Sequence, residues 1–137
     1  MVDSTQEMSN QHVKNIAENI EAIVSGDMYL YKGEYWTTQA LEESDIQIED
    51  NDDVEPASLY DYLDDNYGVT YHVGNDMEVS AVEIMVACGG PNIYIDTSTE
   101  AVELYWWGTR ASEPISEEAV KQVNDWAQEE FDVRRMS

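Results

Sequence analysis

The stretch VTYHVGNDMEVSAVEIMVACGGPNIYIDTSTEAVELYWW, from Val69 to Trp107, decides the fold because apolar and polar residues alternate along it in separate runs. A period of two is typical of strands that bury one face. The runs are separated by short turn sequences, Gly74-Asn75-Asp76, Cys88-Gly89-Gly90-Pro91-Asn92 and Thr97-Ser98-Thr99. Connections as short as these join antiparallel neighbours. We therefore predict a four-stranded antiparallel meander with strands at 69–73, 77–87, 93–96 and 102–107.

The second run contains one irregularity. Its apolar residues occupy odd positions at Met77 and Val79 but even positions from Val82 onward. Because side chains alternate between the two faces of a strand, this change of phase predicts an extra residue, a β-bulge, near Ser80 or Ala81.

The last run ends in two adjacent tryptophans, Trp106 and Trp107. Neighbouring strand residues face opposite ways, so one ring is expected in the core and the other exposed or covered by a helix. Taken singly, each large aromatic ring is more often a core residue than a surface one, so we expect both rings to be buried.

Two long helical patterns flank the strands. Ser4-Thr5-Gln6-Glu7 has the spacing of a capping box, and apolar residues then recur with helical spacing up to Gly26. Near the other end, Ser116 is the expected cap of a helix that begins with two acids. The buried stripe expected of this second helix consists of Val120, Val123, Ala127 and Phe131, with Trp126 flanking it.

Shorter elements are expected between the first helix and the meander. Residues 28–32 and 35–38 are rich in aromatics and indicate a hairpin, and a short helix is expected near 39–43. The acidic connection at 45–57 has little to bury and is expected to be mobile. Ser58 then caps a predicted short helix that runs through Leu59, Leu63 and Tyr67 and stops at Gly68.

These elements predict an α+β fold: an antiparallel four-stranded meander and a short N-terminal hairpin, with the N- and C-terminal helices covering the sheet. The chain has 137 residues, of which 42% are hydrophobic, enough for one sizeable core. We therefore expect one acidic domain over residues 1–137.

Charge is the unusual property of this chain. Thirty Asp and Glu residues oppose six Lys and Arg residues, which gives a net charge of −24 at pH 7. Such a charge destabilises a compact fold through self-repulsion, so it calls for an explanation outside folding. Eighteen of the acids lie between Lys32 and Arg110, where no Lys or Arg occurs: Glu34, Glu42, Glu43, Asp45, Glu49, Asp50, Asp52, Asp53, Glu55, Asp61, Asp64, Asp65, Asp76, Glu78, Glu83, Asp96, Glu100 and Glu103.

Composition also excludes several classes of partner. No stretch reaches about 18 consecutive apolar residues, so no membrane span is expected, and the first ten residues lack the features of a signal peptide. The lone Cys88 cannot form an internal disulfide, which fits a cytoplasmic protein. A polyanion is a poor ligand for nucleic acid or anionic lipid and a good one for basic surfaces.

Metal binding and catalysis are not expected. The acids around Asp50 fail the calcium-loop pattern because Glu55 stands where glycine is needed, and the run from Asp64 to Gly68 fails likewise. Cys88 has no histidine near it in sequence, and the acids around it disfavour its thiolate. We therefore expect no cofactor, no metal site and no enzymatic activity.

The acids are better suited to imitating nucleic acid. Carboxylates on successive turns of a helix lie about 5 to 6 Å apart, and those on one face of a strand repeat about every 6.6 Å, which are separations comparable to those of phosphates. Tyrosines among them can supply the aromatic anchors that concentrate affinity in protein interfaces. The predicted partner-binding residues are Glu49, Asp50, Asp52, Asp53, Glu55, Tyr60, Asp61, Tyr62, Asp64 and Asp65. The alternative is that Tyr62 or Tyr67 packs beneath the short helix.

In its size, its charge and its interleaving of acids with tyrosines, the chain resembles the DNA-mimic inhibitors that phages and mobile elements direct against host defence, the antirestriction and anti-CRISPR proteins. The run MVACGGPNIYIDTSTEAVELYWW, Met85 to Trp107, also resembles a group of uncharacterised proteins of Gram-positive mobile elements, over the central sheet alone. Because DNA-mimic inhibitors do not share one fold, the first resemblance implies a mode of binding and no catalytic residue.

The leading hypothesis is therefore an inhibitor that occupies the positively charged nucleic-acid channel of a defence nuclease, such as a Cas9-type effector or a restriction enzyme. One alternative is an acidic adaptor or regulator of a basic protein that is not a nuclease. Another is a halophilic housekeeping domain, in which acids serve hydration and are expected to be spread evenly.

Overall fold

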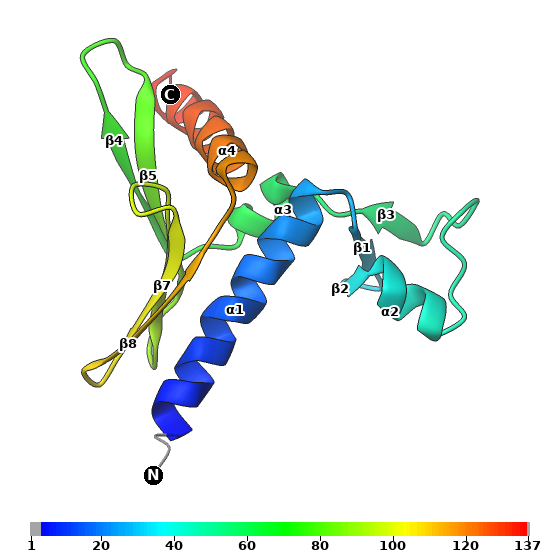
Figure 1. The fold of residues 1–137 in the computed structure, drawn as a ribbon. Helices are drawn as coiled ribbons and strands as arrows, with labels where there is room; N and C mark the ends of the chain where they lie inside the picture. The colour runs from blue at the N-terminus through cyan, green and yellow to red at the C-terminus, as the bar shows by residue number, and fades with distance from the viewer. Residues whose placement is uncertain (1–3, 137) are drawn as a thin grey trace.

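A computed structural model describes residues 4–136 and has an α+β fold with two antiparallel sheets (Figure 1). Its helices and strands, in chain order, are α1 (Ser4–Val24), β1 (Met28–Tyr31), β2 (Glu34–Thr37), α2 (Thr38–Glu43), β3 (Val54–Pro56), α3 (Leu59–Asp64), β4 (Gly68–Val73), β5 (Val79–Ala87), β6 (Asn92–Asp96), β7 (Ala101–Trp106), β8 (Thr109–Pro114) and α4 (Glu117–Met136). The α+β class predicted from the sequence is confirmed.

The larger sheet has five strands in the order β4-β5-β6-β7-β8, not the four predicted. The additional strand, β8, buries only Ala111 among its six residues, so it lacks the apolar alternation that identified the others. A two-residue turn connects it to β7, and both turn residues, Trp107 and Gly108, have positive φ. Such turns match the twist of paired strands.

The expectation that both tryptophans are buried is wrong for Trp107, which lies in this turn. Trp107 is 89% exposed at the tip of the β7–β8 hairpin. Trp106 is half-buried and packs against the core.

The predicted bulge is confirmed. His72 on β4 pairs with Ala81, and the next residue, Val73, pairs with Val79, so Ser80 has no partner across the ladder. Because of the extra residue, the apolar side chains that face the core have odd sequence numbers before the bulge and even numbers after it. From there, Val82 and Ile84 are fully buried.

Helices α1 and α4 lie on the same face of the larger sheet (Figure 1), as predicted. The buried residues of α4 are Ala119, Val123, Trp126 and Ala127. Trp126, expected to flank the stripe, is at its centre and only 2% exposed, whereas Val120 and Phe131 are half-buried. Its indole supplies the largest fully buried side chain of the core.

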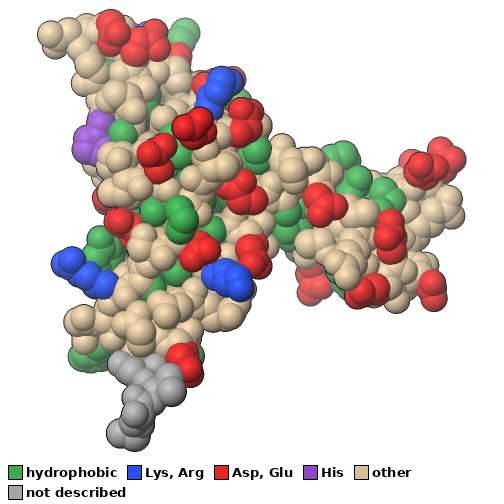
Figure 2. All heavy atoms as spheres, in the orientation of Figure 1, with side chains coloured by type: hydrophobic (Ala, Val, Ile, Leu, Met, Phe, Trp, Pro, Cys, Tyr) green, Lys and Arg blue, Asp and Glu red, His purple; other side chains and the backbone are tan. Residues whose placement is uncertain are grey.

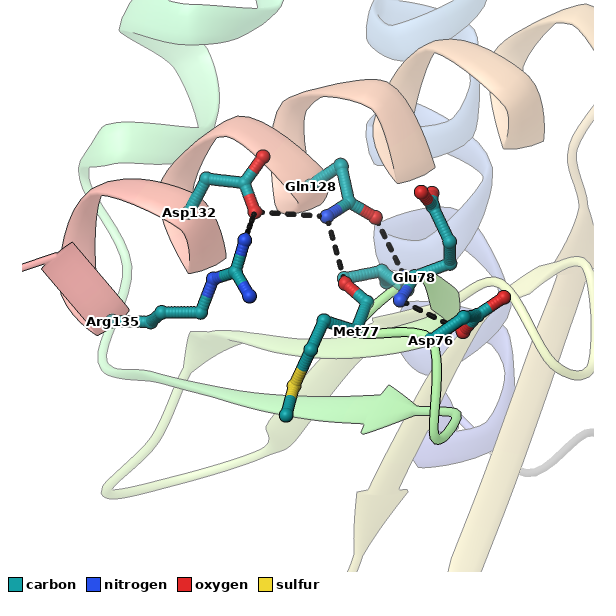
Figure 3. Close-up of polar contacts among 7 residues, drawn as sticks. Asp76, Met77, Glu78, Gln128, Asp132 and Arg135 are labelled. Carbon is teal, nitrogen blue, oxygen red and sulfur yellow. Dashed lines mark hydrogen bonds and ion pairs between the residues drawn. The ribbon is translucent and has the colours of Figure 1, made fainter.

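Gln128 connects α4 to the turn between β4 and β5 (Figure 3). Its side-chain oxygen accepts a hydrogen bond from the backbone N–H of Val79 at 2.6 Å, and its amide nitrogen donates to the carbonyl of Met77 at 3.2 Å. The same nitrogen donates to Asp132 at 3.1 Å, and Asp132 in turn pairs with Arg135 at 3.5 Å. This network fixes the C-terminal half of α4 over the sheet.

The smaller sheet, in the order β2-β1-β3, forms with α2 a lobe of residues 28–56 that projects from the rest of the molecule (Figure 1). The predicted hairpin is present as β1 and β2. The third strand lies within the acidic connection at 45–57, which was expected to have little to bury, yet Val54 on this strand is buried. Leu41 and Val54 are buried but lie outside the main core cluster, so the lobe buries little hydrophobic surface of its own.

Helix α3 is capped as predicted: the Ser58 hydroxyl accepts a hydrogen bond from the backbone N–H of Asp61 at 3.2 Å. The helix ends at Asp64, earlier than the predicted stop at Gly68. Tyr67, assigned to the helix from its spacing, is therefore outside it and is 66% exposed.

Candidate partner-binding surface

The structure places the ten predicted binding residues in two regions. Residues 49–53 lie in the connection between α2 and β3, at the end of the lobe far from α3, and Glu55 lies on β3 (Figure 1). The other five lie on α3 or at its C-cap: Tyr60, Asp61, Tyr62, Asp64 and Asp65. Helix α3 thus carries the part of the predicted site that is closest to the core.

One side of α3 faces a cleft of about 340 Å³, named here the tyrosine cleft. It is lined by Ile16, Tyr35, Asp61, Tyr62, Asp65 and Val86, which come from α1, β2, α3 and β5. Asp61 on α3 and Asp65 at its C-cap both line this cleft. Three predicted site residues, Asp61, Tyr62 and Asp65, therefore line one concave surface between the body and the lobe.

Two aromatic rings form the apolar part of the tyrosine cleft. Tyr35 and Tyr62 contact each other edge to face, with ring centroids 5.5 Å apart and an angle of 77° between the ring planes. Tyr62 is half-buried and packs against the core, as the alternative interpretation of this residue expected. Tyr35 is 38% exposed, so its ring remains accessible from solvent.

The field in this cleft is negative. Burial raises the pKa of the Tyr35 hydroxyl, and the carboxylates of Asp61 and Asp65 raise it further. Burial also raises the pKa of Tyr62. A carboxylate raises the pKa of a neighbouring phenol because it disfavours a second negative charge, and the same field favours a cation.

The other side of α3 faces a cleft of about 570 Å³, named here the helix cleft, which it shares with α4. The Tyr60 hydroxyl donates a hydrogen bond across this cleft to a carboxylate oxygen of Glu129. This hydrogen bond, with smaller contributions from desolvation and nearby acids, raises the pKa of Tyr60 to about 12. Tyr60 therefore joins α3 to α4 while 44% of its surface stays exposed.

The acids at the end of the lobe have a different setting. Glu49, Asp50, Asp52 and Asp53 are all exposed. Their backbone is held by Asn51, whose side-chain nitrogen donates to the carbonyl of Gln47 at 2.6 Å and whose side-chain oxygen accepts from the N–H of Asp53 at 3.1 Å. The connection thus contains a local hydrogen-bonded turn that presents its carboxylates to solvent.

None of the eighteen acids between Lys32 and Arg110 forms an ion pair with Lys or Arg within the described part of the chain. The ion pairs there are Lys14 with Glu18, Lys121 with Asp125 and Arg135 with Asp132, each within one helix. The other three basic side chains contact aromatic residues: Lys32 lies over Tyr31, Arg110 over Tyr105, and Arg134 interacts with Tyr71. Cations from solution or from a partner therefore balance the charge of the eighteen acids.

The acids cover the molecule broadly (Figure 2). Asp and Glu side chains are visible over the body and around the lobe, and the visible face of the lobe shows no Lys or Arg. Of the eighteen acids, all are exposed except Glu83, Asp96 and Glu103, which lie on β5, β6 and β7. The acids are therefore not confined to the predicted residues, and this broad spread is also what the halophilic alternative expects.

Two residues of these clefts were missed from the sequence. Tyr35 lies on β2 and Glu129 on α4, and each reaches α3 only through tertiary packing. Tyr35 belongs to an aromatic run, Tyr35-Trp36, which is a weak signal that marked it only as a strand residue. Glu129 carries no local signal because it is one of many acids in α4.

The described residues contain no group of three or more His, Cys, Asp or Glu side chains arranged to hold a metal ion. Cys88, at the end of β5, is exposed. No helix within residues 4–136 combines the length and the apolar character that crossing a bilayer requires. The chain matches no protein-family model, and comparison with curated proteins and with solved structures gives no match.

Proposed function

We propose that this protein inhibits a host-defence nuclease by placing its carboxylates in the enzyme's positively charged nucleic-acid channel. The observation that supports this most directly is the unpaired charge: the eighteen acids between Lys32 and Arg110 have no ion-pair partner within residues 4–136. A channel rich in Lys and Arg supplies the missing cations, and opposite fields speed association at low salt.

The shape of the lobe supports the same proposal. It carries nine acidic residues against one basic residue, Lys32, and it projects from the body (Figures 1 and 2). A projecting acidic element can enter a groove that is lined with basic side chains. The proposed contacts are the acids at the end of the lobe together with α3.

A direct test uses a guide-loaded Cas9-type effector and a restriction enzyme, each mixed with its cognate DNA duplex in a gel-shift assay. An excess of this protein is expected to abolish DNA binding by at least one of them, and prior loading with DNA is expected to protect that enzyme. The inhibition should weaken steeply as salt increases, because exposed charges are screened. Undiminished DNA binding by both enzymes at low salt would contradict the proposal.

Matched variants locate the site. The lobe variant replaces Glu49, Asp50, Asp52 and Asp53 with the corresponding amides; the control replaces Glu7, Glu18, Glu100 and Glu118, exposed acids of the body. Both remove four charges. Stronger loss of inhibition in the lobe variant supports the proposed contact, and equal loss shows that only total charge matters. Capture of a partner with no role in nucleic-acid metabolism would instead favour the adaptor alternative.

A further inference from the structure

The tyrosine cleft has the chemical lining of a receptor for one organic cation. Two aliphatic side chains, Ile16 and Val86, and two rings, Tyr35 and Tyr62, surround a space of about 340 Å³ to which Asp61 and Asp65 contribute carboxylates. An apolar wall alone favours a neutral guest, and carboxylates alone favour a hydrated ion. The combination favours a group that is cationic and also flat or aliphatic.

No cation of the described chain occupies this cleft. All six Lys and Arg side chains are engaged elsewhere, in the helical ion pairs or against Tyr31, Tyr71 and Tyr105. The cleft is also assembled from four separate elements, and the lobe contributes Tyr35. The two carboxylates therefore face an accessible aromatic ring with no internal counter-ion.

We propose that the tyrosine cleft binds an arginine side chain of the protein's partner. Arginine fits better than lysine because its guanidinium is planar, stacks on aromatic rings and donates paired hydrogen bonds to carboxylates. The aliphatic part of the side chain lies against Ile16 and Val86 while the guanidinium lies between the rings and the carboxylates. The cleft acts as the anchor, and the surrounding acids provide long-range attraction.

This inference rests on the proposed function for the kind of partner, but its test needs no nuclease. The probe is arginine capped at both ends, with capped lysine and capped citrulline as controls, followed by NMR of the full-length protein. Capped arginine is expected to shift the signals of Tyr35, Tyr62, Asp61 and Asp65 most. Capped lysine should bind more weakly, and citrulline, which lacks the charge, should cause no saturable change.

Variants of equal charge separate the cleft from the general acidity of the surface. Asp61→Asn with Asp65→Asn is expected to weaken binding of capped arginine at least about fivefold, since it removes charge-assisted hydrogen bonds. Asp50→Asn with Asp52→Asn, at the end of the lobe, should change it less than about twofold because exposed charges are well screened. Tyr35→Ala should weaken binding without any change of charge.

Signal changes spread over all acidic residues, or equal affinities of the two double variants, would overturn the proposal. Circular dichroism of each variant excludes loss of folding as the cause. The outcomes also separate the two proposals: binding of capped arginine without any nuclease inhibition refutes the proposed function alone, and inhibition unaffected by Asp61→Asn with Asp65→Asn refutes the role of the cleft alone.

Discussion

Tyr60 has the most strongly perturbed hydroxyl among the residues described. Its partner Glu129 accepts a hydrogen bond that only the neutral phenol can donate, so ionisation of Tyr60 breaks the bond and places two negative charges together. The hydrogen bond is the largest cause of the shift to a pKa of about 12, ahead of desolvation. The pKa of Tyr60 is therefore a measure of the contact between α3 and α4.

Titration of Tyr60 is therefore a test of this contact. NMR of labelled tyrosine rings is expected to show Tyr60 ionising near pH 12, and Glu129→Gln should move its pKa toward the ordinary value of 10.0. Because the folded-state pKa is raised, the contribution to stability is complete below pH 10 and is lost as the pH rises through 12. Tyr60→Phe should remove this part of the alkaline destabilisation. Ionisation of Tyr60 at its ordinary pKa would show that the contact with Glu129 is absent in solution.

At the scale of elements, α3 is short and depends on its cap and on burial. Six residues cannot form a stable helix alone. Ser58 satisfies the backbone N–H of Asp61, and Leu59 and Leu63 are buried in the core. These contacts fix the direction in which the carboxylates of Asp61 and Asp65 extend into the tyrosine cleft.

Ser58→Ala tests the contribution of the cap. The expected loss is about 1 kcal/mol of unfolding free energy, the usual cost of removing a serine cap. Urea denaturation followed by circular dichroism measures it. Ser112→Ala, an exposed position on β8, is the control and should change stability by less than about 0.5 kcal/mol. Equal effects of the two substitutions would mean that the cap does not stabilise α3.

The lobe is the second element that determines the site, because it supplies Tyr35. Its sheet has only three short strands, and β3 pairs with β1 over three residues. Its buried hydrophobic side chains are Met28, which belongs to the main core cluster, and Leu41 and Val54, which do not. Small sheets with so little burial open more readily than large ones.

Hydrogen exchange should therefore distinguish the lobe from the body. Backbone amides of β1 are expected to exchange faster than those of β6, at the centre of the five-stranded sheet. The connection at 45–57, predicted to be mobile, should exchange fastest except where β3 pairs with β1. Equal protection of β1 and β6 would mean that lobe and body unfold as one cooperative unit.

At the scale of the whole molecule, a net charge of −24 is distributed over the lobe, the helices and the uncovered face of the large sheet. The large hydrophobic core, with residues from α1, α3, α4 and the five strands, opposes the repulsion among these charges. Salt bridges oppose it little, because the three that are described are exposed pairs within helices, which contribute little each.

Salt should therefore stabilise the protein without being required for folding. Raising sodium chloride from about 0.02 M to about 0.5 M is expected to raise the melting temperature by about 3 to 4 °C, which corresponds to roughly 1 kcal/mol for a domain of this size. A variant with Glu49, Asp50, Asp52 and Asp53 changed to amides should show a smaller rise. Unfolding at low salt, detected by circular dichroism, would instead favour the halophilic alternative.

The sequence by itself determined the elements whose pattern is local. The alternation from Val69 onward specified four strands of the large sheet, and its change of parity located the bulge at Ser80. Ser58 and Ser116 indicated their helix starts, since a cap needs only a side chain and a backbone N–H a few residues away. The charge and its uneven distribution were likewise properties of the sequence.

Tertiary structure alone decided which residues meet. Strand β8 was not predicted because it buries one side chain and depends on pairing with β7, and β3 depends in the same way on β1. The packing of α4 placed Trp126 at the centre of the core, and the lobe brought Tyr35 to Tyr62. Contacts between residues distant in sequence depend on how the elements are arranged in space, and the periodicity of a single segment does not specify this arrangement. The sequence could therefore indicate the acids and tyrosines but not the cleft that they form.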